Sequence, residues 1–292
     1  NSCLGPLMIF SKPVSFYLQT LFLKTWLLFC LLTASSVFAE SAIVWQGSWQ
    51  QGSLLLGKVK PGALVSHAGE QLKTTEDGRF LFGLGRNAQG HSIFVISNPN
   101  GSRSEEQYAI GERIYPTQKI EGVPQRTVEP PAGQIQRIKS DSALVSQARR
   151  EVTGTTDFLE GFIKPLEGPR TGVYGSQRFY NGIPKSPHYG VDYAAPTGSL
   201  VIAPAAGIVR LAHRDLFYSG GTLIVDHGHG LTSTFLHLSD ILVSPGSRVG
   251  RGDSIARVGA TGRATGPHLD WRMNWRSIRI DPELVLETLP AQ

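Results

Sequence analysis

Glycine and proline interrupt this chain at short intervals, and they limit the length of any regular element it can form. The 292 residues include 33 glycines and 18 prolines. Glycine favours turns and proline cannot continue a helix, so the composition predicts many short strands joined by turns. Hydrophobic residues make up 40% of the chain, which is enough for packed cores. We therefore expect an all-β fold.

The first 39 residues have the pattern of an export signal. Lys12 and Lys24 flank an apolar stretch, and the uncharged run between Lys24 and Ala39 is shorter than the about 20 residues that span a bilayer. Val37 and Ala39 are small residues at the two positions that a signal peptidase reads. We predict a signal peptide at residues 1–39 and export to the periplasm or cell envelope, with no stable membrane span after cleavage. An uncleaved membrane anchor is the alternative.

Residues 40–115 are expected to form a small N-terminal β-sandwich. Their β-type runs have strand length and are separated by turn signals such as Asp77-Gly78, which favours a hairpin because glycine tolerates φ > 0. His67 and His91 are isolated in this region, as is typical of surface or strand histidines. No cluster of titratable groups marks this part of the sequence.

Residues 116–161 have the composition of a linker with one short helix. Prolines and glycines are frequent at its start, and Ser140-Asp141 offers an N-cap for a helix that ends near Gly154. Short β-type runs bounded by glycine, proline or serine return in residues 162–286. They predict a C-terminal antiparallel β domain without a long helix.

The chain is moderately basic. Its formal net charge is +5 and its pI is about 9.3. Loss of Lys12 and Lys24 with the signal would lower the charge to +5 − 2 = +3. This balance suits an anionic partner such as the bacterial cell wall, although solubility alone is an alternative reason for it. The basic residues are scattered rather than gathered in a tract, so nucleic acid is not an expected partner.

Cysteine placement restricts the kind of metal site this chain can build. Both cysteines, Cys3 and Cys30, lie within the predicted signal peptide. The mature protein would then have no cysteine, which excludes disulfides and zinc sites with thiolate ligands. Any metal site must be made of histidine and carboxylate side chains.

Two segments of the C-terminal region pair a histidine with an aspartate. His188 and Asp192 are four residues apart, and in an extended chain that bends at Gly190 both side chains can reach a common ion. His268 and Asp270 are two residues apart, so on a strand they point to the same face. Two buried polar groups side by side need a metal or a hydrogen-bond network to satisfy them.

A further histidine, His237, interrupts the apolar run around Leu236 and Leu238. A core histidine that donates a hydrogen bond to a backbone carbonyl is the simpler interpretation of this position alone. Together with the two histidine–aspartate pairs, however, it completes enough ligands for an open zinc site with three protein donors and a water molecule.

Residues 162–285 resemble the lysostaphin/LytM family of zinc peptidases, which cleave peptide bonds in peptidoglycan. The matching motifs, in chain order, are His188-Tyr-Gly-Val-Asp192, Val225-Asp226-His227-Gly228, Phe235-Leu-His237-Leu-Ser239 and Gly266-Pro-His268-Leu-Asp270. The resemblance implies a small antiparallel β fold with a narrow groove above its sheet.

The resemblance also implies roles for individual residues. His188 and Asp192 match zinc ligands, and His237 and His268 match two non-ligand histidines that stabilise the transition state and transfer protons. Arg178 matches a basic position near the groove that binds substrate. His213, His227 and His229 match no role and are expected at turn or surface positions.

The third zinc ligand of the family is normally a histidine, and here that position is Asp270. Aspartate is a legitimate zinc donor, but two carboxylates would neutralise Zn²⁺ and make it a weaker Lewis acid. The same change tilts the preference toward harder ions such as Mn²⁺. We expect zinc, with manganese as the alternative.

These observations predict a secreted zinc-dependent endopeptidase that hydrolyses peptide bonds in peptidoglycan cross-links. Both D-Ala–diaminopimelate cross-links and glycine bridges are compatible with the resemblance. One alternative is a non-catalytic LytM-like wall-binding regulator of other peptidoglycan hydrolases, which the departure at Asp270 favours. Another makes the N-terminal β-sandwich the active, polymer- or protein-binding part of the chain.

Overall fold

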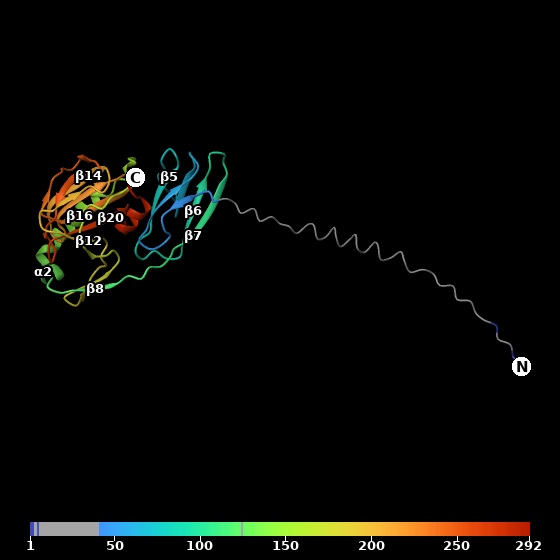
Figure 1. Ribbon diagram of the computed structural model, residues 1–292, viewed down its shortest axis with the longest axis horizontal. Helices are drawn as coiled ribbons and strands as arrows, with labels where there is room; N and C mark the ends of the chain where they lie inside the picture. Colours follow the sequence, from blue (N-terminus) through green and yellow to red (C-terminus); the bar gives the residue numbers. More distant parts are fainter. Residues whose placement is uncertain (3–4, 6–40, 124) are drawn as a thin grey trace. The chain divides into compact units, whose positions relative to one another are not determined.

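Strands dominate the computed structural model of this chain, and the expected all-β fold is confirmed (Figure 1). The structure describes residues 1–2, 5, 41–123 and 125–292. The signal peptide predicted at residues 1–39 lies outside these residues except for positions 1, 2 and 5. Within the described part of the chain, no helix is both long and apolar enough to cross a membrane.

Two small antiparallel sheets form the N-terminal part of the fold. The first has the order β1 (Val44–Gln46), β2 (Leu54–Lys58), β5 (Arg79–Gly83). The second has the order β4 (Glu70–Gln71), β3 (Leu64–His67), β6 (His91–Ser97), β7 (Arg103–Ala109). Aromatic rings pack the two sheets together: the ring centroid of Trp45 lies 5.2 Å from that of Phe80 and 5.1 Å from that of Phe94. His67 and His91 lie on strands, as expected.

The segment predicted as a linker is more ordered than its composition suggests. It contains β8 (Thr117–Ile120), α2 (Gln125–Val128), the 3₁₀ turn η1 (Ala132–Gln134) and α3 (Ile135–Ala148). A second 3₁₀ turn, η2 (Asp157–Glu160), follows. Strand β8 pairs in parallel with β10 (Gln177–Tyr180), which also pairs with β11 (Ile183–Pro184). The linker is therefore joined to the C-terminal part by a sheet.

The prediction for the helix was wrong at both ends. Helix α3 begins at Ile135 rather than at Ser140-Asp141, and no side chain caps its N-terminus. The carboxylate of Asp141 instead accepts a hydrogen bond from the backbone N–H of Phe217 at 2.7 Å. The helix stops at Ala148, and Thr153, which follows it, donates to Asp226 Oδ2 at 3.0 Å in an extended segment. Tertiary partners thus override the local signals.

An eight-stranded sheet forms the centre of the C-terminal part. Its order is β18 (Arg248–Val249), β14 (Gly207–Leu216), β15 (Gly220–Asp226), β16 (Leu231–Leu238), β20 (His268–Trp275), β12 (Val191–Ala194) and β9 (Arg170–Gly172), and β21 (Ile278–Ile280) also pairs with β20. All these pairings are antiparallel, as predicted. A smaller sheet contains β13 (Leu200–Ile202), β19 (Ser254–Arg257) and β17 (Asp240–Ile241).

The alternation along β20 separates the core from the site. Leu269, Trp271 and Met273 are fully buried, as their period of two predicts for a strand with one face on the core. The opposite face carries the polar residues His268, Asp270, Arg272 and Asn274. This strand consequently presents one continuous row of polar side chains.

The C-terminal helix α4 (Pro282–Thr288) lies where the two parts of the fold meet. Asp281 caps its N-terminus by accepting from the backbone N–H of Glu283 at 3.0 Å. The same carboxylate accepts two bonds from Arg113, at 3.0 Å each. Residues 41–292 form one unit through such contacts. The domain boundaries expected near residues 115 and 161 remain predictions.

Candidate active site

Two aspartates face each other across neighbouring strands at the centre of the site. The register of β12 and β20 places Asp192 directly opposite Asp270. Like charges directly opposite each other destabilise a sheet unless a cation lies between or beside them. Gly190 allows this approach, because a Cβ atom at that position would lie 2.5 Å from Asp270 Oδ1.

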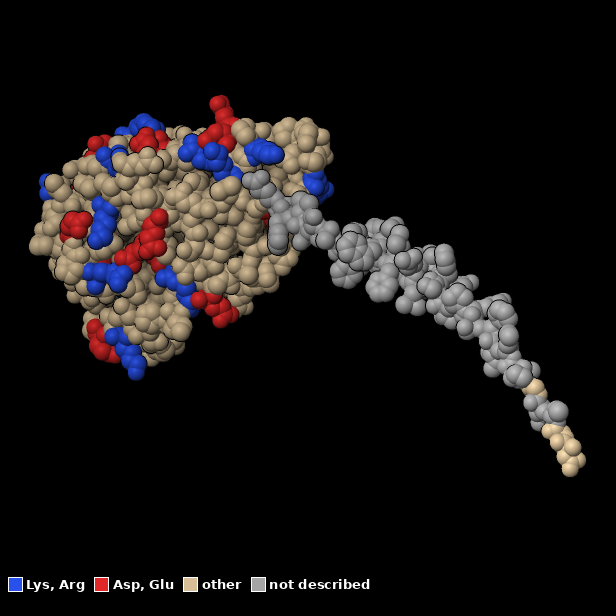
Figure 2. Space-filling model, turned by 45° about the vertical axis from the view of Figure 1, so that its right-hand side comes forward, with Lys and Arg blue, Asp and Glu red and all other residues tan. Residues whose placement is uncertain are grey.

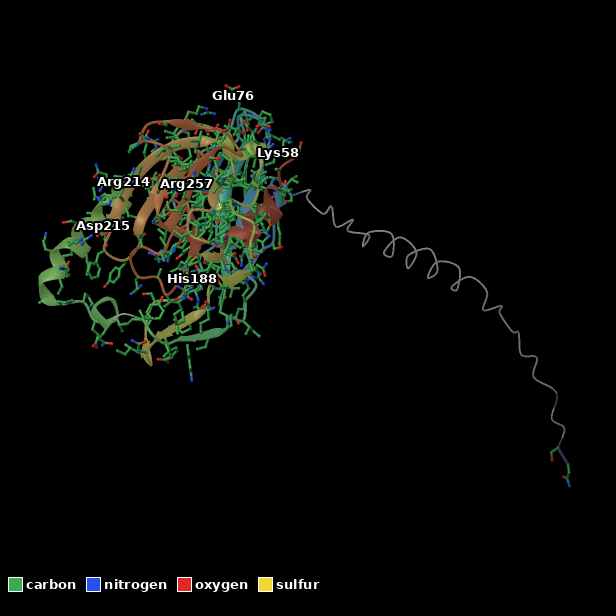
Figure 3. All side chains as sticks on the ribbon, turned by 60° about the vertical axis from the view of Figure 1, so that its left-hand side comes forward. Lys58, Glu76, His188, Arg214, Asp215 and Arg257 are labelled. Carbon is green, nitrogen blue, oxygen red and sulfur yellow. The ribbon has the colours of Figure 1, made fainter. Side chains whose placement is uncertain are left out.

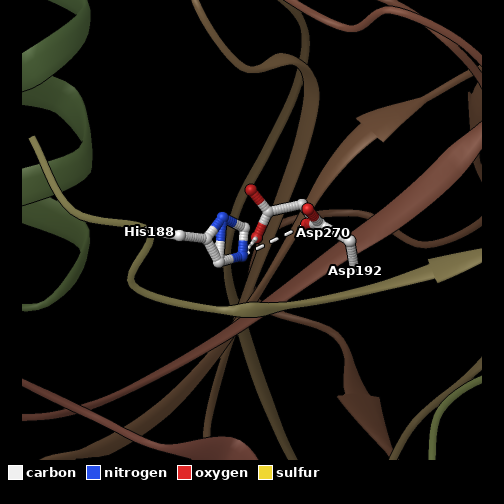
Figure 4. A group of neighbouring side chains, drawn as sticks. All are labelled: His188, Asp192 and Asp270. Carbon is white, nitrogen blue, oxygen red and sulfur yellow. Dashed lines mark ion pairs between the residues drawn. The ribbon is translucent and has the colours of Figure 1, made fainter. Parts of the chain in front are cut away.

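His188 completes the group by entering just before β12 (Figure 4). Its Nε2 atom lies 3.2 Å from Asp192 Oδ1 and 3.9 Å from Asp270 Oδ1. One donor atom from each of the three residues lies within 4.8 Å of the others, and all three residues are buried. In Figure 3, His188 lies apart from Lys58 on β2 and from Glu76 in the turn between β4 and β5.

Unsatisfied atoms in this group fit a metal ion. Both ring nitrogens of His188 and Oδ1 of Asp192 are buried without a hydrogen-bond partner. Such atoms are costly unless a ligand satisfies them. One imidazole and two carboxylates are donors that zinc accepts, with a position left for water or substrate. The residues predicted as ligands are thus brought together in an arrangement that suits the ion.

Each carboxylate is bound by an arginine. Arg178 Nη2 donates to Asp192 Oδ2 at 2.5 Å. Arg272 donates from Nε to Asp270 Oδ1 at 2.9 Å and from Nη2 to Asp270 Oδ2 at 2.5 Å. Such partners fix the orientation of a metal ligand. The two arginines also offset part of the negative charge of the carboxylates. The two aspartates would therefore neutralise a bound zinc ion less than their own charges suggest.

Arg272 was not among the residues that the sequence predicted. The sequence could have indicated Arg272, because Arg272 stands two positions after Asp270 on the same strand and the two side chains must share one face. Arg178 was predicted to bind substrate, but its three guanidinium nitrogens contact Gln118, Tyr180 and Asp192 at 3.3, 3.3 and 2.5 Å.

The protonation states of the three donors suit metal binding near neutral pH. Burial lowers the pKa of His188 well below 6.5, which leaves the imidazole neutral. Burial and the charge of Asp270 raise the pKa of Asp192 to about 6. Burial opposes ionisation of Asp270 as well, yet Arg272 holds the pKa of that carboxyl well below its usual range. Deprotonated donors are what a metal ion requires.

His237 and His268 lie side by side next to this group. Their ring centroids are 4.9 Å apart. His237 Nδ1 lies 2.7 Å from the carbonyl oxygen of Thr261, and His268 Nδ1 lies 2.8 Å from that of Gly266. A carbonyl can only accept, so each Nδ1 carries the proton and each Nε2 is an acceptor in the neutral ring.

His237 shows two further signs of a functional position. Burial lowers its pKa to about 4, so the ring is neutral and able to accept a proton. Its backbone has φ = +63°, a conformation that non-glycine residues adopt at a cost and that is concentrated at functional sites. The hydrogen bond to a carbonyl that the sequence predicted for a core histidine is also present.

The group opens into a cavity of about 520 Å³. Its wall includes His188, His237 and Asp270, together with five basic residues, namely Arg178, Lys185, Arg263, Arg272 and Arg279. A second cavity, of about 430 Å³, borders Asp192 and His268 on the other side. Arg178 lines both cavities. Donors and histidines are therefore reachable from solvent along a groove.

The other histidines of the C-terminal part do not join the site. His227 and His229 lie at the turn between β15 and β16, as expected, but both are buried. His227 Nδ1 lies 2.7 Å from the carbonyl oxygen of Ala206, and its Nε2 lies 2.8 Å from Ser233 Oγ. These bonds satisfy the ring inside the core. His213 lies on β14.

Comparison with known proteins identifies this part of the chain. The profile of Peptidase family M23 matches residues 186–282. The peptidoglycan DD-endopeptidase ShyA of Vibrio cholerae is 41% identical over 88 residues, which are 30% of this chain and 20% of that protein. The DD-carboxypeptidase/endopeptidase Mpg of Neisseria meningitidis is 36% identical over 103 residues, 35% of this chain and 24% of that protein. The match thus spans about a fifth to a quarter of these relatives.

A solved structure extends the likeness over most of the fold. The crystal structure assigned to peptidase M23 from Pseudomonas aeruginosa has a TM-score of 0.63 and 27% identity, and covers 83% of this chain and 96% of that one. The likeness therefore includes the N-terminal sheets as well as the site. The matched profile spans all three clustered residues, and the family resemblance expected from the sequence is confirmed for this segment: residues 186–282 form a domain of Peptidase family M23.

Proposed function

We propose that this chain is an exported, zinc-dependent endopeptidase that hydrolyses peptide bonds in peptidoglycan cross-links. The observation that carries the proposal is the buried group of His188, Asp192 and Asp270, which lies beside the paired rings of His237 and His268 and borders two cavities. Relatives named as peptidoglycan endopeptidases support the substrate. Export is part of the proposal because peptidoglycan, the proposed substrate, lies in the cell envelope.

His188, Asp192 and Asp270 would hold the zinc ion. When bound, zinc supplies a Lewis acid that polarises the scissile carbonyl and lowers the pKa of a water molecule. The second carboxylate was the reason to consider manganese, but Arg272 takes up the charge of Asp270. We therefore propose zinc as the ion.

The two histidines would handle the proton and the developing charge. Each has Nδ1 fixed by a backbone carbonyl, so Nε2 is the atom that is free to act in the groove. One Nε2 accepts the proton of the attacking water, and the other ring, when it is protonated at Nε2, donates a hydrogen bond to the tetrahedral oxyanion.

Arg178 receives a different role from the one first expected. Because its guanidinium already binds Asp192, Gln118 and Tyr180, we propose that it positions Asp192 rather than serving mainly as a substrate contact. Its place on the wall of both cavities still brings its charge near any bound peptide.

Hydrolysis of purified peptidoglycan tests the proposal. Zinc-loaded protein should release soluble peptide fragments that mass spectrometry identifies as products of cross-link cleavage. His237→Ala and His268→Ala should each lower the rate by about a hundredfold or more, since each removes one proton-transfer group. His91→Ala, an exposed histidine on β6, is the matched control and should keep the wild-type rate.

The same assay tests the alternative that this protein is a non-catalytic, wall-binding regulator of other peptidoglycan hydrolases. A wall-binding protein without activity would bind peptidoglycan but release no fragments, with or without zinc. If wild-type protein is inactive, or if both histidine variants retain the wild-type rate, the assignment of this site as catalytic is wrong.

A further inference from the structure

The groove continues beyond Arg272 into a smaller cavity beneath helix α3. This third cavity, of about 280 Å³, shares Leu236, Arg272 and Arg279 with the wall of the 520 Å³ cavity that His188 and Asp270 line. Its outer wall is formed by α3 through residues such as Ile138 and Val145. A peptide bound over the metal ligands can therefore extend into it.

The polar face of the sheet forms the floor of this cavity. Asp270, Arg272 and Asn274 alternate along β20 and share one face. The register of β21 places Arg279 opposite Asn274, so its side chain stands on the same face. Asn274 is buried and lines this cavity.

Arg149 closes the cavity from the helix side. It is the C-cap residue of α3, and its Nη2 donates to Thr234 Oγ1 at 2.6 Å. Its Nε is buried without a hydrogen-bond partner. Burial, followed by the charges of Arg279 and Arg272, lowers the pKa of Arg149 to about 9. Crowded guanidinium groups of this kind are stabilised when an anion binds between them.

The charges around the cavity are not balanced by the protein itself. Arg272 is paired with Asp270, but no ion pair of Arg149 or Arg279 with a carboxylate is found among residues 41–123 and 125–292. Asp141, the one carboxylate on the wall, accepts from the backbone of Phe217. By contrast, basic and acidic side chains are interspersed on the face shown in Figure 2.

We propose that Arg149, Arg279 and Asn274 form a subsite that binds a carboxylate of the peptide being cleaved. Two guanidinium groups and an amide offer several donors to one carboxylate, and arginine matches the geometry of that group. The ring of Tyr189 packs 4.5 Å from the Arg279 guanidinium and holds it in place. The substrate is then a peptide with a free carboxylate, rather than an uncharged glycine bridge. This inference rests on the proposed function.

Paired substrates test the subsite. One is a purified cross-linked muropeptide dimer with free carboxylates, and the other is the same dimer with those carboxylates amidated. Wild-type protein should cleave the acidic dimer with a kcat/KM about tenfold to a hundredfold higher, mainly through KM. Arg149→Gln and Arg279→Gln should each bring the ratio of the two values toward one. Arg150→Gln, on the exposed residue next to Arg149, should keep the wild-type ratio.

The ratio of kcat/KM for the acidic dimer to kcat/KM for the amidated dimer separates binding of the carboxylate from a structural role of the arginines. If Arg149 only anchors α3, its replacement lowers cleavage of both dimers equally, and the subsite is overturned. Arg149→Lys and Arg279→Lys keep the charge and should retain part of the preference. Equal cleavage of both dimers by wild-type protein would also overturn the proposal.

Binding measurements keep this inference apart from the proposed function. Calorimetric titration of His268→Ala with each dimer should show the same preference and the same dependence on Arg149 and Arg279. Preferential binding without any hydrolysis by wild-type protein would contradict the proposed function and support the subsite. If inorganic phosphate binds with this arginine dependence and the acidic dimer does not, the cavity is a site for a free anion and the proposal is wrong.

Discussion

Residue 270 shows how an aspartate can occupy a position where a histidine is usual. Its side chain is shorter than imidazole, and the direct pairing of Asp270 with Asp192 across two strands brings both carboxylates close to His188. The pairing would be unfavourable alone. Arg178 binds Asp192 Oδ2 and leaves Oδ1, the atom that faces His188, without a hydrogen-bond partner, whereas Arg272 binds both oxygens of Asp270. The aspartate and its arginine therefore act as one unit.

The affinity for zinc should rise with pH and level off near pH 7. The pKa of Asp192 is raised to about 6, so below that pH zinc must displace a proton from it. His188 and Asp270 have lowered pKa values and are already deprotonated there. We expect affinity to fall by about tenfold per pH unit below pH 6. Competition with a chromophoric chelator between pH 5 and 8 measures this, and equal affinities at pH 5 and pH 7 would contradict it.

The same shift has an opposite effect on the metal-free fold. The folded chain holds the proton of Asp192 more tightly than the unfolded chain, whose carboxyl group has the ordinary value of 3.8. The stabilisation from this group is therefore present at low pH and is lost as the pH rises from about 4 to about 6.

The sequence indicated which three residues cluster at the site but not which side chains bind them. His188, Asp192 and Asp270 come together as the motif spacing indicated. Arg178 binds Asp192 from a separate strand, β10, and no local pattern connects the two. Contacts between distant segments depend on the strand order, which motif spacing does not encode.

At the scale of elements, strand β20 belongs to both the hydrophobic core and the candidate site. One face buries Leu269, Trp271 and Met273, and the other carries the polar row that includes His268 and Asp270. A slip of one residue in register would exchange the two faces. Packing of the apolar face thus sets the geometry of Asp270, the proposed metal ligand.

A matched pair of leucines tests this dependence. Leu269→Ala removes a fully buried side chain from β20 and should lower the free energy of unfolding by about 2–5 kcal/mol. Leu200→Ala, on β13, removes a side chain that is 48% exposed and should cost less than about 1 kcal/mol. Denaturant unfolding of both variants gives the values, and equal losses would show that the faces are wrongly assigned.

Strands were predicted better than helix ends. Alternation of apolar and polar residues with a period of two indicates which side chains of a strand face the core. The sequence therefore predicted correctly which residues of β20 are buried. Helix α3 has no buried residue and no capping side chain, so its ends depend on what the flanking segments contact. The bond of Asp141 to Phe217 is one such contact, and it joins residues 76 positions apart.

At the scale of the molecule, the N-terminal sheets are tied to the C-terminal part by polar and aromatic contacts. Arg113 binds Asp281 at 3.0 Å, and Thr288 Oγ1 donates to the carbonyl oxygen of Leu54 at 3.0 Å. The rings of Phe82 and Trp275 have centroids 5.5 Å apart. Since Trp275 ends β20, the N-terminal sheets support the same strand that carries Asp270.

Asp281 should be important for the stability of the whole fold. Asp281→Ala removes both the cap of α4 and the partner of Arg113, and should lower the free energy of unfolding by about 1–3 kcal/mol. Asp240→Ala breaks an exposed ion pair with Arg214 and should leave the free energy of unfolding nearly unchanged. Chemical denaturation compares the two, and a smaller loss for Asp281→Ala would refute this role.

The zinc content of the purified chain tests the central claim most directly. Mass spectrometry after dialysis against metal-free buffer should find about one zinc ion per wild-type chain and per Asp240→Ala control chain. Asp270→Asn, which keeps an oxygen for Arg272 but removes the anionic donor, should retain almost none, and so should His188→Ala. A wild-type chain without zinc, or an Asp270→Asn chain with a full equivalent, would contradict a zinc site built from His188, Asp192 and Asp270.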